Sequence, residues 1–97
     1  MATYLILYKY TQQGINAIKD APKRVEAAKK AAAEAGITIR ETMWLQGEYD
    51  FMAITEANDE IAATAFGLNI AKQGNVRAVT MRAFTVAEMG KILAKVA

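Results

Sequence analysis

The stretch WLQGEYDFMAI, residues 44–54, places a glycine between two runs of residues that have the composition of β-strands. Residues 37–45 alternate between apolar and polar side chains, with Glu41 as an exception, which is typical of a strand with one covered face. Residues 49–55 are rich in aromatic and β-branched side chains and predict the next strand. Because Gly47 can adopt a positive φ, the stretch predicts a tight hairpin at the centre of the chain.

The segments on either side of this hairpin repeat one pattern, a strand followed or preceded by a helix. Residues 3–10 are apolar on both alternating faces, as in a central strand covered on both sides. Pro22 suits the first turn of a helix that would end at Gly36. Asn58 or Asp59 is expected to cap a second helix, which reaches about residue 73 and stops at Gly74. Residues 76–84 predict a fourth strand.

A last helix is expected to begin at Thr85, with Glu88 as its capping-box partner. The order is therefore β-α-β-β-α-β with an extra C-terminal helix, in one domain over residues 1–97. Right-handed crossovers give a ferredoxin-like α+β fold: a four-stranded antiparallel sheet with strands one and three in the middle and both helices on one face. We expect the C-terminal helix to cover part of the other face and a second copy to cover the rest. The product would be a dimeric α+β barrel with a cavity between two sheets.

Composition excludes several classes of chemistry. The chain has no His and no Cys, so imidazole bases, thiolate nucleophiles and metal sites built from those ligands are excluded. It lacks the glycine-rich nucleotide fingerprints and the serine-hydrolase elbow. A net charge of +2, from 12 basic and 10 acidic residues, is too small to indicate a nucleic-acid or membrane partner. We expect no cofactor, no metal and a cytoplasmic location.

Three segments resemble the GYD domain family: residues 10–36, 47–59 and 74–85. The family takes its name from the turn in which this chain has Gly47, Tyr49 and Asp50. Ala78 and Met81 stand where the family pattern would have Thr and Leu. The resemblance implies a homodimeric α+β barrel of ferredoxin-like subunits, of the kind found in bacteria and archaea, and it implies no particular reaction.

The wider group of dimeric α+β barrels contains three functional classes that this chain resembles in fold. Some members are cofactor-free monooxygenases or isomerases of aromatic or polyketide-like substrates, and some bind haem through a His that is absent here. Others are amino-acid-sensing modules with a similar Gly-x-Tyr-Asp turn. The resemblance therefore leaves binding and catalysis open.

The two carboxylates beside the glycine have three alternative roles. Asp50 could accept backbone N–H bonds that lock the hairpin, it could contact a ligand at the mouth of the barrel, or it could form an acid–base pair with Glu48. We favour the structural role. A two-residue loop would place Trp44 on one face with Tyr49 and Phe51, whereas a three-residue loop would place it with Asp50 and Met52.

Other pocket candidates are polar or aromatic residues on the expected strands. Arg40, Thr42 and Trp44 are expected on the face opposite the helices, looking into the dimer cavity. The full candidate set is Tyr8, Tyr10, Arg40, Thr42, Trp44, Asp50, Thr80 and Arg82. Hydroxyls on an apolar face suit a pocket with a few placed polar groups, and an Arg could hold a carboxylate or enolate.

Three functions compete on this evidence. The leading hypothesis is a homodimer that binds a small molecule, as a sensor or carrier. The alternative is a cofactor-free enzyme in which Tyr8, Tyr10 or Asp50 accepts a proton and Arg40 or Arg82 stabilises an oxyanion. RNA binding fits poorly, because the third strand, GEYDFMAI, carries acids where RNA-recognition domains need a basic residue.

Overall fold

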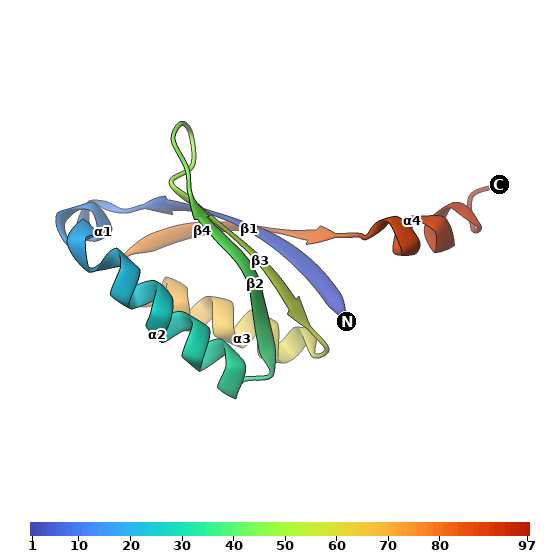
Figure 1. Ribbon diagram of the computed structural model, residues 1–97, viewed down its shortest axis with the longest axis horizontal. Helices are drawn as coiled ribbons and strands as arrows, with labels where there is room; N and C mark the ends of the chain where they lie inside the picture. The colour runs from blue at the N-terminus through green and yellow to red at the C-terminus, as the bar shows by residue number, and fades with distance from the viewer.

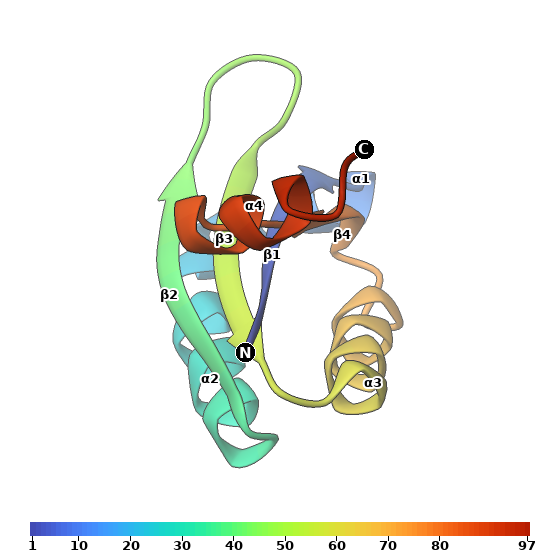
Figure 2. The same cartoon turned by 90° about the vertical axis from the view of Figure 1, so that its right-hand side faces the viewer.

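The computed structural model describes residues 1–97 and has the expected β-α-β-β-α-β order with a C-terminal helix, together with a short helix and a 3₁₀ turn after the first strand that were not expected. The strands are β1 (Ala2–Tyr10), β2 (Ile37–Trp44), β3 (Phe51–Ala57) and β4 (Val76–Ala83). The helices are α1 (Gln12–Asn16), a short 3₁₀ turn η1 (Ile18–Asp20), α2 (Ala21–Glu34), α3 (Glu60–Ala71) and α4 (Val86–Leu93). All strand pairs are antiparallel, in the order β2-β3-β1-β4, with α2 and α3 on one face (Figures 1 and 2). The predicted ferredoxin-like α+β fold is confirmed.

The expected helix ends are also confirmed. The Asp59 carboxylate accepts hydrogen bonds from the backbone N–H groups of Ile61 and Ala62 at the start of α3. Thr85 and Glu88 form the capping box of α4. Each cap satisfies N–H groups that have no partner inside the helix. No helix is both long enough and apolar enough to cross a membrane.

The helix-facing side of the sheet forms the core. The side chains of β3 alternate in burial, with Phe51, Ala53, Thr55 and Ala57 buried under the helices. Their partners on β1 point the same way, since residues paired across two strands share a face. Small residues allow α2 to approach closely: Ala32 is fully buried against Ile37 and Ala57. Burying a side chain the size of Ile37 stabilises the fold by about 1.5–3 kcal/mol.

A β-bulge in β2 changes which residues face the helices. Arg40 has no partner on β3, and the register shifts between Ile39 and Glu41. One extra residue reverses the alternation, so Thr42 and Trp44 lie opposite the buried Ala53 and Phe51. The expectation that Thr42 and Trp44 face away from the helices is therefore wrong, and the bulge explains why Glu41 broke the pattern.

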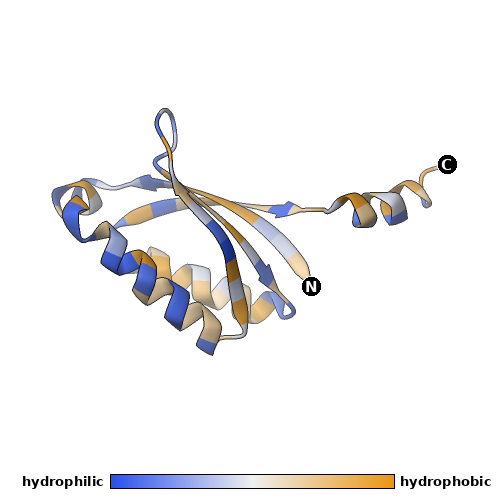
Figure 3. Cartoon of the chain, viewed as in Figure 1, coloured by the Kyte–Doolittle hydropathy of each residue, from blue (hydrophilic) through white to orange (hydrophobic).

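The other face of the sheet, which we call the open face, has no helix over it. By strand pairing it presents Leu5 and Leu7 from β1 beside Met52, Ile54, Val79 and Met81. The helix α4 continues beyond the end of β4 and stands clear of the sheet (Figures 1 and 3). Apolar residues along α4 are exposed, with Val86 92% accessible. The expectation that the C-terminal helix covers part of this face is wrong, because β4 and α4 run on in nearly the same direction.

Candidate functional site

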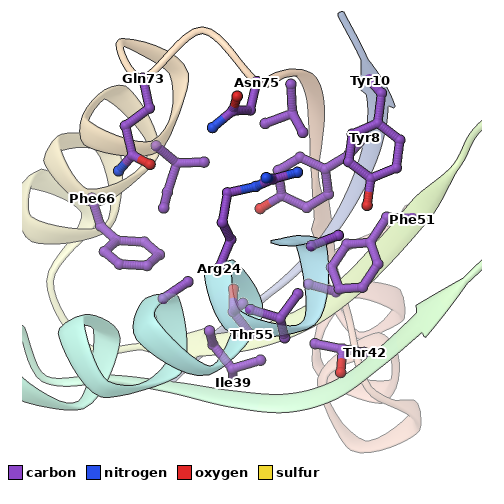
Figure 4. A pocket seen from close by; sticks show the side chains of 16 residues that line it. Tyr8, Tyr10, Arg24, Ile39, Thr42, Phe51, Thr55, Phe66, Gln73 and Asn75 are labelled. Atoms are coloured by element: carbon purple, nitrogen blue, oxygen red, sulfur yellow. The ribbon is translucent and has the colours of Figure 1, made fainter. Parts of the chain in front are cut away.

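A cavity of about 100 Å³ lies between the helix-facing side of the sheet, α2 and α3 (Figure 4). Its walls are mainly apolar and come from Ala21, Val25, Ala28, Ile39, Phe51, Ala53, Phe66, Ile70 and Val76. The polar residues that line it are Tyr8, Tyr10, Arg24, Thr42, Thr55, Gln73 and Asn75. A wider groove of about 350 Å³ lies beside it under α3 and shares Tyr8, Thr55 and Phe66. The cavity therefore belongs to one protomer and does not lie between two sheets.

An aromatic cluster lies at the β2 side of the cavity. The Trp44 indole N–H donates a hydrogen bond of 2.9 Å to the hydroxyl of Tyr10. The Trp44 and Phe51 rings meet edge to face, with centroids 5.0 Å apart. The Tyr8 and Phe51 rings are 5.8 Å apart. Of the two arrangements left open by the sequence, Trp44 shares a face with Phe51 and not with Asp50 and Met52.

Asp50 fastens the hairpin to the end of β1. Its backbone N–H donates to the Tyr8 carbonyl at 2.9 Å, and its carboxylate accepts from the Tyr10 N–H, also at 2.9 Å. Its carbonyl accepts from the Leu45 N–H at 2.8 Å. Gly47 adopts the expected positive φ, 125°. The connection from β2 to β3 spans residues 45–50, so the expected tight turn with a loop of two or three residues is wrong. Glu48 lies in the loop, exposed, 3.9 Å from the Lys9 ammonium. The two carboxylates therefore face different partners, and the contacts of Asp50 match the hairpin-locking role.

Arg24 enters the cavity from α2 without a carboxylate partner. One guanidinium nitrogen, Nη1, donates to the Ala17 carbonyl at 3.0 Å. The other, Nη2, is buried and has no hydrogen-bond partner. Figure 4 shows the side chain reaching into the space between the tyrosines of β1 and the side chains of Gln73 and Asn75.

Tyr8 is the lining residue whose proton affinity is altered. Burial raises the pKa of its hydroxyl above the ordinary value of 10.0, and no hydrogen bond within the chain contributes to the shift. A phenol with the ordinary pKa is already protonated at neutral pH, and the upward shift favours the protonated form further, so the hydroxyl can donate a hydrogen bond.

The structure brings three of the eight sequence candidates into the cavity wall: Tyr8, Tyr10 and Thr42. Trp44 does not line the cavity, but its indole N–H donates a hydrogen bond to Tyr10, which does. Thr80 lines only the wider groove under α3. The other three, Asp50, Arg40 and Arg82, line neither space. Arg40 pairs with Glu56 at 3.0 Å, and Arg82 pairs with Glu88 at 3.3 Å.

Sequence reasoning missed Arg24, Gln73 and Asn75. Arg24 lies in a run of interleaved basic and acidic residues, a pattern typical of a solvated helix face. Its spacing carried the signal, because Arg24 follows Ala21 by three residues and precedes Ala28 by four, and both alanines line the cavity. Gln73 and Asn75 flank Gly74 in the connection to β4, and no local pattern marks that connection as part of a pocket.

The GYD domain family model matches residues 4–93. A relative from Thermus thermophilus, named glutamine synthetase and cystathionine beta-lyase binding protein, is 27% identical over 90 residues, which cover 92% of this chain and 95% of the relative. A solved chain that is 21% identical superposes with a TM-score of 0.60 over 87% of this chain and 100% of its own. A hypothetical protein of Pyrococcus horikoshii, 23% identical, gives a TM-score of 0.55 over 88% of this chain and 92% of its own. These two structures support the fold.

Proposed function

The chain belongs to the GYD domain family, and we propose that it is a small binding protein whose ligand is a small organic molecule. One observation carries the proposal: a mostly apolar cavity under α2 and α3 with a few polar groups pointing inward. Small-molecule sites in proteins have this composition. The site differs from the one expected from sequence, since one protomer encloses it. A sensor or carrier role fits a domain that holds a ligand without changing it.

The contacts of the candidate proton acceptors favour binding over the alternative, a cofactor-free monooxygenase or isomerase. A tyrosine base needs a lowered pKa, and burial raises the pKa of Tyr8. Tyr10 accepts a hydrogen bond from Trp44, and the carboxylate of Asp50 holds the backbone of β1. Each group that the enzyme hypothesis would use as a base has either an unsuitable proton affinity or a structural contact.

The proposal includes a homodimer formed through the open face. This face carries Leu5 and Leu7 at its centre, and Met43, Val79 and Met81 are at least 38% accessible. A contiguous apolar face of this kind is typical of a surface that another protein covers. A second copy offers the same face, so the two sheets can stack with their apolar strips together.

A second candidate partner is a different protein. The Thermus thermophilus relative is named for binding two enzymes, and here α4 presents Val86, Met89 and Leu93 to solvent beyond the sheet. An exposed apolar helix of this type can dock in a groove on a partner. A cross-linking experiment with photoreactive groups on α4 would separate self-association from a different partner.

The cavity proposal is tested by native mass spectrometry of freshly purified protein, followed by denaturing conditions that release bound molecules. Ala28→Phe places a ring in the cavity wall, while Ala27→Phe, at the exposed neighbouring position, is the matched control. We expect the wild type and Ala27→Phe to carry the same small molecule and Ala28→Phe to lose it. Equal loading of the two folded variants, or wild-type protein with nothing bound, would count against the proposal.

A further inference from the structure

We infer that the ligand is a compact monocarboxylate and that the guanidinium of Arg24 is its counter-ion. This inference rests on the proposed function, since it identifies the chemistry of the same cavity. The carrying observation is a buried cationic nitrogen that has no partner inside the chain.

The chain supplies no counter-ion to the positive charge beside the cavity. The guanidinium group of Arg24 is a positively charged donor. No Asp or Glu lines the cavity, and Arg24 takes part in none of the ion pairs of the structure. Arg24 is half-buried, and its buried Nη2 lacks the hydrogen bond that a bound carboxylate would accept. A ligand anion supplies what the chain itself does not.

The neighbouring polar groups act as hydrogen-bond donors. The Asn75 side-chain oxygen accepts from the Gln13 amide at 2.9 Å, which turns its NH₂ group the other way. In Figure 4 that nitrogen lies on the cavity side, towards Arg24. The Tyr8 hydroxyl, whose pKa is raised further above neutrality by burial, is a third donor. Donors from α2, β1 and the connection before β4 therefore surround one space, which is the arrangement a carboxylate needs.

The volume of the cavity and the chemistry of its walls further limit the chemical class of the ligand. A cavity of about 100 Å³ has room only for a small molecule. Beyond the donors the walls are aliphatic and aromatic, with Phe51 and Phe66 on opposite sides in Figure 4. The ligand therefore has one carboxylate and a compact apolar or aromatic body, and it carries no second charge.

Benzoate and benzamide test the inference because they share a shape and differ in charge. Binding is measured by isothermal titration calorimetry at millimolar probe concentrations, with the fluorescence of Trp44 as a second readout. Arg24→Met removes the charge, and Arg40→Met is the control, since Arg40 is exposed and pairs with Glu56. We expect wild type and Arg40→Met to bind benzoate at least tenfold more tightly than benzamide. Arg24→Met should lose this preference.

The results distinguish failure of the inference from failure of the proposed function. Equal binding of the two probes, unchanged in Arg24→Met, would overturn the carboxylate assignment and leave a neutral-ligand cavity. No binding of either probe to the wild type would overturn both. If Arg24→Met does not fold, Arg24→Lys keeps the charge and loses the two-nitrogen fork. It is then expected to bind benzoate several-fold more weakly, and unchanged binding would refute the role of Arg24.

Discussion

Asp50 and Glu48 are two residues apart in the same loop, yet their removal is expected to have very different effects on stability. Asp50→Ala deletes the acceptor of the Tyr10 N–H, a partly buried donor in the last residue of β1. A hydrogen bond to a charged group contributes about 1.5–3 kcal/mol to stability, and in the variant the Tyr10 N–H has no other acceptor within the chain. Glu48→Ala removes an exposed ion pair with a 3.9 Å separation, for which about 0–1 kcal/mol is usual.

The assay is urea unfolding followed by the fluorescence of Trp44, the single tryptophan, at fixed protein concentration. We expect Asp50→Ala to lower the free energy of unfolding by about 1.5–3 kcal/mol. For a domain of this size the melting temperature would fall by about 6–24 °C. Asp50→Asn keeps an uncharged acceptor and should lose roughly half as much. A loss below about 0.5 kcal/mol in Asp50→Ala, or an equal loss in Glu48→Ala, would refute the assignment of Asp50 as the fastening of the hairpin.

Three further predictions concern packing, assembly and pH. Gly14→Ala should destabilise by about 1–3 kcal/mol in urea unfolding, because its Cβ would lie 2.0 Å from a backbone oxygen, whereas Gly67→Ala, with open space in α3, should stabilise by about 0.5–1 kcal/mol. Val79→Asp puts a charge on the open face, and sedimentation analysis is expected to show a dimer for the wild type and a monomer for the variant. The hydrogen bond from the Thr85 backbone lowers the pKa of Glu88, so the start of α4 should be stable above the usual carboxyl range and fray as pH falls through the lowered value. An NMR titration of the Thr85 amide should show that transition in the wild type and not in Glu88→Gln.

The sequence predicted the fold well because each element carried its own local signal. Asp59 and Thr85 marked helix starts through side chains that satisfy free N–H groups, and the glycine of the hairpin marked a turn. Such signals depend on a few adjacent residues, so they can be identified without knowing the tertiary structure. The strand order then followed from the handedness of the crossovers.

The site was harder to predict because it depends on which β2 side chains face the helices and on which side of α2 faces the sheet. The bulge at Arg40 moved Thr42 and Trp44 to the other face, and the only warning was the misplaced acid at Glu41. Arg24 belongs by composition to a solvated helix and by spacing to the core-facing side. For Arg24 the spacing from Ala21 and Ala28 indicates its position better than the composition of the surrounding segment does. The direction of α4 could not be predicted, because an amphipathic helix has the same sequence whether it covers its own sheet or a partner.

The bulge also limits how copies of this chain can assemble. An unbroken edge strand offers a row of free N–H and C=O groups, and copies that join edge to edge can add strands without end. β2 is an edge strand, and the bulge interrupts that row at its middle, where Arg40 and Glu41 add charge. Growth of a continuous sheet into a fibre is thereby hindered. The proposed contact between two open faces would leave neither apolar strip free for a third copy, so it would give a particle of fixed size.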